Sequence, residues 1–224
     1  MANDYFRFKQ FTVSQARCAM KVGTDGTLLG AWARGGCRVL DIGTGTGLIA
    51  LMMAQRFPSA QVLGIDIDPD AVLQAKANAA SSPFAERVSI EQTDVKCLFA
   101  QPLDAIVCNP PYFVDSLECP DSQRTLARHA ATLSYADLMA NAWRLLTDDG
   151  ELSVVIPFDC KARLETEAVI QGFFKVREWA VKTTPHKMPR RYLLSFGKHA
   201  GELDRGEGVI GSQWYNELTK DFYL

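Results

Sequence analysis

The stretch Val39-Leu40-Asp41-Ile42-Gly43-Thr44-Gly45-Thr46-Gly47 decides the fold of this chain. It opens as a short apolar run, which predicts a buried strand at 38–41, and continues into three glycines spaced two residues apart. Glycine accepts backbone conformations that other residues avoid, so these positions favour a tight turn leading into a helix over 47–57. The stretch therefore predicts a strand–turn–helix unit whose helix amides can approach a bound ligand.

Outward from this unit, short β-branched runs alternate with longer stretches of helical pattern. Further strands are expected at 61–66, 88–92, 103–109, 152–156, 176–181 and 192–197, and further helices at 70–81, 135–146 and 161–172. Strands separated by helices favour a mainly parallel sheet with helices on both faces. The last two strands have no helix between them, so we expect an antiparallel C-terminal strand. The predicted fold is α/β, a Rossmann-like doubly wound sheet of about seven strands.

The length and composition fit one large α/β domain. The chain has 224 residues, of which 47% are hydrophobic and 22% are charged, and its formal net charge is −2. We expect an N-terminal extension at 1–34 that packs near the ligand site, a Rossmann-type domain at 35–200, and a tail at 201–224 that completes this domain. A slightly acidic chain could meet a polyanion only through a local basic surface.

The sequence also bears on compartment and metal content. Its apolar runs are too short to span a membrane, and its first residues lack the pattern of a secretory signal. The six cysteines, at 18, 37, 97, 108, 119 and 160, have no CxxC spacing, and the three histidines are not placed to complete a metal site. We therefore expect reduced thiols, a cytoplasmic location and no metal cofactor.

The glycine turn is compatible with two kinds of ligand. Its segment 45–50 fits the weak G-x-G-x-x-A pattern of dinucleotide sites. However, Asp41 precedes Gly43, Gly45 and Gly47, and a carboxylate there suits the cationic amino group of a methionine moiety, whereas it would repel a pyrophosphate. The arrangement favours S-adenosylmethionine, with these four residues as contacts.

Two further aspartates stand at the ends of the next strands. Asp66 ends the second strand, 25 positions after Asp41, where a βαβ unit places a ribose-binding acid. Asp94 follows the third strand, and its carboxylate can accept a hydrogen bond from an adenine amino group. Either residue could instead cap a turn or helix, although Asp68 and Asp70 fit that simpler role better than Asp66 does.

The motif Asn109-Pro110-Pro111-Tyr112 follows directly after the apolar run 103–108. Two prolines alone would simply end a strand, which leaves the flanking Asn and Tyr unexplained. An aromatic or amide –NH₂ is a poor nucleophile because its lone pair is delocalised, so it must be held in line with a methyl donor. The Asn109 side-chain oxygen and the Pro110 carbonyl can accept from one such amine, and Tyr112 can stack on an extruded base. We assign these three residues catalytic roles.

Taken together, these residues resemble the class I N-methyltransferases with an [N/D/S]-P-P-[Y/F] motif. The resemblance implies that 41–47 is the cofactor loop, that Asp66 contacts ribose, that Asp94 contacts adenine, and that 109–112 is the catalytic loop. It further implies that Thr24 and Asp25, which precede the first strand, help enclose the methionine end. A Gly-Thr-Asp-Gly turn that caps a helix explains that pair equally well.

The two ends of the chain carry a narrower resemblance. The segments Phe6-Arg7-Phe8-Lys9-Gln10-Phe11 and Leu218-Thr219-Lys220-Asp221-Phe222-Tyr223-Leu224, with the intervening 20–32, are similar to the bacterial tRNA1(Val) adenine-N6-methyltransferases. This resemblance implies transfer of a methyl group from S-adenosylmethionine to the N6 amine of adenine 37, next to the anticodon, with tRNA1(Val) as the partner.

Basic residues gather in two segments. Residues 175–198 carry seven Lys and Arg against the single acid Glu178, and residues 5–21 carry four against none. A charge run is usually only a solvated face, but these runs stand out in an acidic chain, so we expect phosphate contacts. The segment 113–129 is long enough to form a substrate lid. The expected substrate contacts are Pro111, Phe113, Arg128, Lys187, Arg190 and Arg191.

Three alternative functions remain open at this point. Methylation of a protein glutamine amide uses the same motif, although about 35 residues precede the first strand, too few for the extra helical domain that release-factor enzymes usually carry. Methylation of DNA adenine usually needs a target-recognition domain, for which the chain has little room. A NAD(P)-binding oxidoreductase or a non-catalytic nucleotide-binding module gives Asn109 and Tyr112 no role.

Overall fold

A mostly parallel sheet of eight strands forms the centre of the computed structural model, which describes residues 4–18, 21–110 and 133–224. Its strands lie in the order β10-β8-β9-β7-β6-β3-β4-β5. They are β3 (Arg38–Ile42), β4 (Gln61–Asp66), β5 (Val88–Gln92), β6 (Leu103–Cys108), β7 (Leu146–Pro157), β8 (Phe174–Lys182), β9 (Arg191–Gly197) and β10 (Asp204–Val209). Only β9 runs antiparallel to its neighbours. The predicted Rossmann-like fold and its antiparallel strand are confirmed.

Helices follow most strands, and several begin or end where the sequence carries a matching signal. Among the described residues they are α1 (Thr24–Trp32), α2 (Leu48–Arg56), α3 (Pro69–Ala80), the 3₁₀ helix η1 (Val95–Cys97), α5 (Tyr135–Leu145), α6 (Phe158–Gln171) and α7 (Gln213–Thr219). The Asp68 side chain accepts from the Asp70 amide at the start of α3, and Ser134 accepts from the Asp137 amide at the start of α5. Helix α6 ends at Gly172, whose φ of 98° suits glycine.

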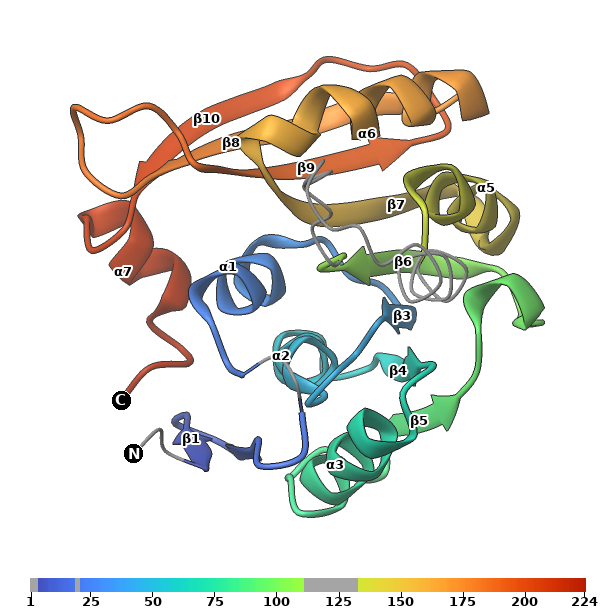
Figure 1. Cartoon of the computed structure of the whole chain (residues 1–224), viewed down its shortest axis with the longest axis vertical. Helices are drawn as coiled ribbons and strands as arrows, with labels where there is room; N and C mark the ends of the chain where they lie inside the picture. The colour runs from blue at the N-terminus through green and yellow to red at the C-terminus, as the bar shows by residue number, and fades with distance from the viewer. Residues whose placement is uncertain (1–3, 19–20, 111–132) are drawn as a thin grey trace, which may run out of the picture.

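Two hydrophobic cores lie on opposite faces of the sheet. In β6, Val107 joins the core that α1, α2 and α3 cover, whereas Ile106 joins the core beneath α5 and α6. This alternation follows from the two-residue period of a strand. Figure 1 shows α1 and α2 on one side of the sheet and α5 on the other. Both faces are therefore buried, and the ligand site must lie at an end of the strands.

The sheet contains one strand, β10, beyond the expected count of about seven. It pairs parallel to β8 at the sheet edge, within 201–224, where no strand was expected. Its sequence, DRGEGV, is charged and glycine-rich, which disfavours a strand. The glycines are explained by tryptophan packing: a Cβ on Gly206 would approach the Trp179 ring to 2.1 Å, and one on Gly208 would approach Trp214 to 2.0 Å.

The N-terminal segment forms structure that the sequence did not predict. Strands β1 (Tyr5–Arg7) and β2 (Thr12–Ser14) pair as a separate antiparallel hairpin, and α1 packs on α2 within the main core. The chain's C-terminus meets this hairpin (Figure 1). The Lys9 amide donates to the Phe222 carbonyl at 2.8 Å, and the ring of Phe8 stacks on the ring of Tyr223 with 5.9 Å between their centroids. The two terminal motifs therefore form one aromatic cluster.

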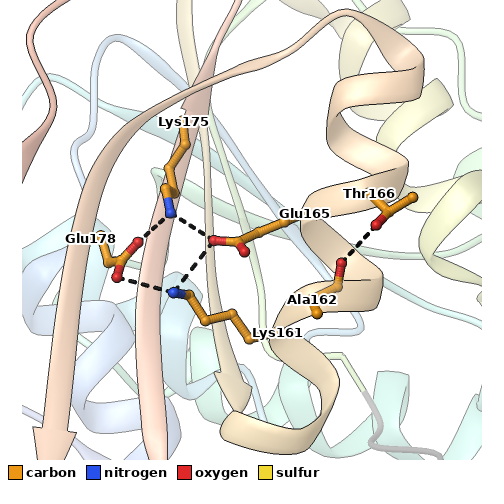
Figure 2. Close-up of polar contacts among 6 residues, drawn as sticks. All are labelled: Lys161, Ala162, Glu165, Thr166, Lys175 and Glu178. Carbon is orange, nitrogen blue, oxygen red and sulfur yellow. Dashed lines mark hydrogen bonds and ion pairs between the residues drawn. The ribbon is translucent and has the colours of Figure 1, made fainter.

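Helix α6 is fixed to β8 by four alternating charges (Figure 2). Lys161 Nζ lies 3.0 Å from Glu178 Oε1 and 3.6 Å from Glu165 Oε1, and Lys175 Nζ lies 2.7 Å from the same Glu165 oxygen. Lys175 also pairs with Glu178. Because these groups are partly buried, salt screens them less than it screens surface pairs. Lys175 and Glu178, which belong to the predicted basic segment 175–198, are thus engaged in ion pairs with residues of α6.

The end of α5 differs in detail from its predicted boundary. The predicted helix ends at 146 and the next predicted strand begins at 152, whereas residues 146–151 already belong to β7, where the pairing with β6 shifts between Leu103 and Ala105. The strand therefore starts at Leu146 and carries an irregularity before it pairs regularly. Across the described ranges, none of the helices has the length and apolar character needed to traverse a membrane.

Candidate active site

The ends of four neighbouring strands bring the predicted site residues together. Ile42 at the end of β3 is in register with Ile65 of β4 on one side and with Cys108 of β6 on the other. Strand order reverses at β3, because the chain proceeds to β4 and β5 and then returns to β6. Ligands bind at such a switch point, beyond the carboxyl ends of the strands. Gly43 directly follows β3 and Asn109 directly follows β6. Neighbouring strands of a sheet lie about 4.8 Å apart.

A cavity of about 560 Å³ opens at this point. Its volume falls in the range of small-molecule and cofactor sites. It is lined by Cys18, Lys21, Val22, Gly23, Thr24, Asp25, Gly26, Ile42, Gly43, Thr44, Gly45, Thr46, Leu48, Ile49, Ile65, Asp66, Ile67, Asp68, Ala71, Thr93, Asp94, Val95, Lys96, Cys108, Asn109, Pro110 and Leu133. The glycine turn and the Asn-Pro pair therefore share one cavity, as the methyl-transfer interpretation requires.

The glycine turn has the backbone that its sequence predicts. Gly43, Gly45 and Gly47 have φ values of 68°, 55° and 81°, which favour glycine. A Cβ on Gly43 would meet no atom within 4 Å, so its open side faces the cavity. Gly47 instead packs against Ala75 of α3 and does not line the cavity. Its role is therefore to start α2 close to α3.

Asp41 lies behind the glycine turn and does not line the cavity. Its side chain is fully buried, and its Oδ2 accepts from the Thr44 hydroxyl at 2.6 Å and from the Ala50 amide at 3.1 Å. Its Oδ1 has no hydrogen-bond partner among the described residues. Burial raises the pKa of Asp41 to about 7, against the hydrogen bonds from Thr44 and Ala50. The carboxylate thus shapes the turn and leaves one buried acceptor unmatched.

Asp66 and Asp94 both line the cavity, as expected from their places at strand ends. Asp66 Oδ2 accepts from the Gly45 amide at 2.9 Å, and its Oδ1 accepts from the Asp68 amide. Asp94 accepts from the Lys96 amide and lies 3.4 Å from Lys96 Nζ. Each carboxylate therefore accepts from nearby backbone amides and also lines the cavity, so a capping role does not prevent the predicted binding role.

The wall on the N-terminal side comes from Cys18 and 21–26, including Thr24 and Asp25 in the first turn of α1. Nearby, the side-chain nitrogen of Asn78 donates at 2.8 Å to the Ser14 carbonyl and at 2.8 Å to the Thr46 carbonyl. Asn78 thus ties the hairpin to the glycine turn. Sequence reasoning missed it, although its spacing of four from Gln74, which accepts from the Arg17 amide, was a signal.

The reacting side of the cavity carries Asn109 and Pro110. Asn109 is partly buried at the end of β6 and Pro110 is buried. Beneath them, burial first and then the charges of Asp41 and Asp66 raise the pKa of the Cys108 thiol. That thiol is neutral and belongs to the floor of the site. Four predicted site residues, Pro111, Tyr112, Phe113 and Arg128, lie outside the described residues.

The predicted RNA contacts separate into two groups. Lys187 and Arg190 are exposed in the segment between β8 and β9. Because β9 is antiparallel, this segment lies at the same edge of the sheet as the cavity. Arg191 is different, since its Nε donates to Asp25 Oδ2 at 2.7 Å. No group of three or more His, Cys, Asp or Glu side chains suited to a metal occurs in 4–18, 21–110 or 133–224.

Comparison with known proteins identifies the family. Residues 27–188 match the methyltransferase small domain. A tRNA1(Val) (adenine(37)-N6)-methyltransferase of Bacteroides thetaiotaomicron is 46% identical over 236 residues, covering 100% of this chain and 99% of the relative. Relatives of the same name from Phocaeicola vulgatus and Histophilus somni are 47% and 43% identical, covering 100% and 98% of this chain and 99% and 97% of theirs. The chain belongs to this methyltransferase family.

Solved structures agree with this family at the level of the fold. A methyltransferase from Agrobacterium tumefaciens aligns with a TM-score of 0.69 at 17% identity, covering 88% of this chain and 96% of that one. TrmN from Thermus thermophilus aligns with a TM-score of 0.56 at 24% identity, covering 77% of this chain and 47% of that one. The predicted resemblance to the N-methyltransferases is confirmed by the family match, which favours it over the dinucleotide-binding alternative.

Proposed function

We propose that this chain transfers a methyl group from S-adenosylmethionine to the N6 amine of an adenine in tRNA, at position 37 of tRNA1(Val), in the cytoplasm. The observation that carries the proposal is the single cavity shared by the glycine turn and the Asn109-Pro110 pair. The full-length similarity to relatives named for this activity supports the choice of substrate.

The residues that line the cavity fit S-adenosylmethionine. Asp66 and Asp94 offer carboxylate oxygens for the ribose and the adenine, and Gly43 presents a side without a Cβ to the ligand. Thr24 and Asp25, at the N-terminus of α1, offer polar groups for the methionine end. The unmatched Oδ1 of Asp41 lies just behind the turn and favours a cation nearby. When bound, the cofactor supplies a methyl group on a positively charged sulfur.

The protein's part in the reaction is to hold the amine. The Asn109 side-chain oxygen and the Pro110 carbonyl accept hydrogen bonds from the –NH₂ and fix its lone pair toward the cofactor side of the cavity. The amine becomes acidic once the methyl group is transferred, so these oxygens and water receive its proton without a strong base. Tyr112 stacks on the extruded base, which is worth about 1–3 kcal/mol.

The tRNA backbone approaches over the exposed Lys187 and Arg190. Both lie at the cavity edge of the sheet, and neither side chain forms an ion pair with any described residue. A polyanion can therefore bind there without breaking an existing ion pair. The net charge of −2 makes such a local surface necessary.

Methylation of total tRNA tests the proposal directly. Unmodified tRNA from a strain that lacks the enzyme is incubated with the protein and labelled S-adenosylmethionine, and the digested nucleosides are analysed by mass spectrometry. We expect N6-methyladenosine in one fragment that contains the anticodon of tRNA1(Val). Parallel reactions contain release-factor protein and double-stranded DNA. Methyl transfer to either of these and none to tRNA would overturn the proposal.

A further inference from the structure

Arg191 differs from its basic neighbours in where its side chain goes. It is the first residue of β9, in register with Val181 of β8 and Pro157 of β7, at the cavity edge of the sheet. The side chain of Arg191 is only partly exposed, at 34%, whereas Lys187 and Arg190 are exposed. Arg190 precedes the strand and is exposed, so the two arginines differ in their surroundings although they are adjacent in sequence.

The guanidinium of Arg191 already has two partners that hold it in place. Its Nε donates to Asp25 Oδ2 at 2.7 Å, and its Nη1 donates to the Arg190 carbonyl at 3.0 Å. The bond to Asp25 joins residues 166 positions apart and connects β9 to the first turn of α1. These two bonds hold the guanidinium beside α1 and use part of its set of five donors.

Asp25 lines the cavity beside Gly23 and Thr24, and 24% of its side chain is exposed. Its bond to Arg191 holds this side chain, which lies in the first turn of α1, against the start of β9. A carboxylate has about four acceptor positions, so the bond to Arg191 takes up only part of the acceptor capacity of Asp25.

We propose that Arg191 is a positioning residue of the cofactor site, which holds Asp25 toward the amino-acid end of S-adenosylmethionine, and that it is not a phosphate contact. This inference rests on the proposed function, because it assumes that the cavity holds that cofactor. It moves Arg191 from the predicted RNA contacts to the residues that shape the cofactor site. The RNA surface then consists of Lys187 and Arg190, and the cofactor site extends to the first residue of β9.

The test uses the full chain without RNA. Titration calorimetry with S-adenosylmethionine and with S-adenosylhomocysteine compares wild type, Arg191→Gln, Arg191→Lys and the matched control Arg190→Gln. We expect Arg191→Gln to raise the cofactor Kd about five- to tenfold, with partial recovery in Arg191→Lys, which keeps the charge but loses the second hydrogen bond. Arg190→Gln should leave this Kd unchanged.

A double-variant cycle separates positioning from a general effect on folding. If Arg191 acts through Asp25, Arg191→Gln should add nothing to the cofactor Kd in an Asp25→Asn background. Thermal unfolding of each variant checks that the fold is intact. Binding of tRNA is then measured against salt concentration, where Arg190→Gln should reduce the slope by about one and Arg191→Gln should not.

Two results would overturn the inference. One is an unchanged cofactor Kd in Arg191→Gln together with a reduced salt slope for tRNA, which would make Arg191 a phosphate contact. The other is an additive cycle, in which both single variants weaken cofactor binding independently. If wild type itself did not bind the cofactor, the proposed function would fail instead, so the two failures are distinguishable.

Discussion

Replacing Asp41 with asparagine should stabilise the protein in the absence of cofactor. Burial raises the pKa of Asp41 from the ordinary 3.8 to about 7. At 1.36 kcal/mol per unit, the ionised carboxylate costs the folded state about 4 kcal/mol. Asparagine keeps an oxygen that accepts from Thr44 and Ala50 but places an –NH₂ where Oδ1 has no partner, which costs about 1–3 kcal/mol. The expected net gain at pH 8 is about 1–3 kcal/mol.

The sign of the pH dependence follows from the raised pKa. Between pH 3.8 and about 7 the folded chain keeps Asp41 protonated whereas the unfolded chain is ionised, so wild-type stability rises as the pH falls through 7. Above pH 7 both states are ionised and the full penalty is present. The advantage of Asp41→Asn should therefore be largest at pH 8, fall as the pH decreases below 7, and be lost at about pH 5.

Thermal unfolding without cofactor at pH 8 and at pH 5 measures this difference. Each kcal/mol corresponds to about 2–4 °C in Tm for a chain of this size. A variant that is less stable than wild type at pH 8, or a difference that is equal at the two pH values, would refute the reasoning. The same variant should bind S-adenosylmethionine more weakly, because the cationic ligand favours the ionised Asp41 that asparagine lacks.

Three other predictions concern catalysis, RNA and the terminal cluster. Asn109→Ala should lower kcat at least about 100-fold while the calorimetric cofactor Kd stays within twofold, and a large loss of cofactor binding would contradict its role at the amine. Charge reversal of Lys187 and Arg190 should weaken tRNA binding and flatten its dependence on salt in filter-binding assays, whereas unchanged affinity would exclude this surface. Phe222→Ala should lower the free energy of unfolding in urea by about 3–5 kcal/mol, because its side chain is 1% exposed, with Leu224→Ala, 79% exposed, as the matched control. Equal stabilities of these last two variants would show that the terminal cluster is not part of the cooperative core.

The sequence predicts the site as far as strand ends determine it. Asp66, Asp94 and Asn109 each stand at or just after the end of a predicted strand, and the carboxyl ends of parallel strands meet on one side of the sheet, so their convergence follows from topology. The observed boundaries of helices and strands differ from the predicted ones by a few residues, and one of these differences affects the site. Strand β3 extends through Ile42, so Asp41 points into a face beneath α2 and not out of the strand end.

What the sequence does not predict depends on partners far away along the chain. The glycines of β10 oppose strand formation locally and make sense only against Trp179 and Trp214. Asn78 looks like an ordinary polar residue of an amphipathic helix until α3 meets both the glycine turn and the hairpin. In each case the deciding interaction is a tertiary contact, which local propensity and periodicity do not contain.

The basic run between β8 and β9 shows how one segment can serve two ligands. Because β9 reverses direction, the segment returns to the cavity edge and its charges lie next to the site. The two adjacent arginines then differ: Arg190 precedes β9 and is exposed, where a phosphate can reach it, and Arg191 bonds to Asp25 on α1. Charge counting treats the two as equivalent, since composition carries no direction. The tertiary contact between Arg191 and Asp25 is what separates the surface suited to RNA from the wall of the cofactor cavity.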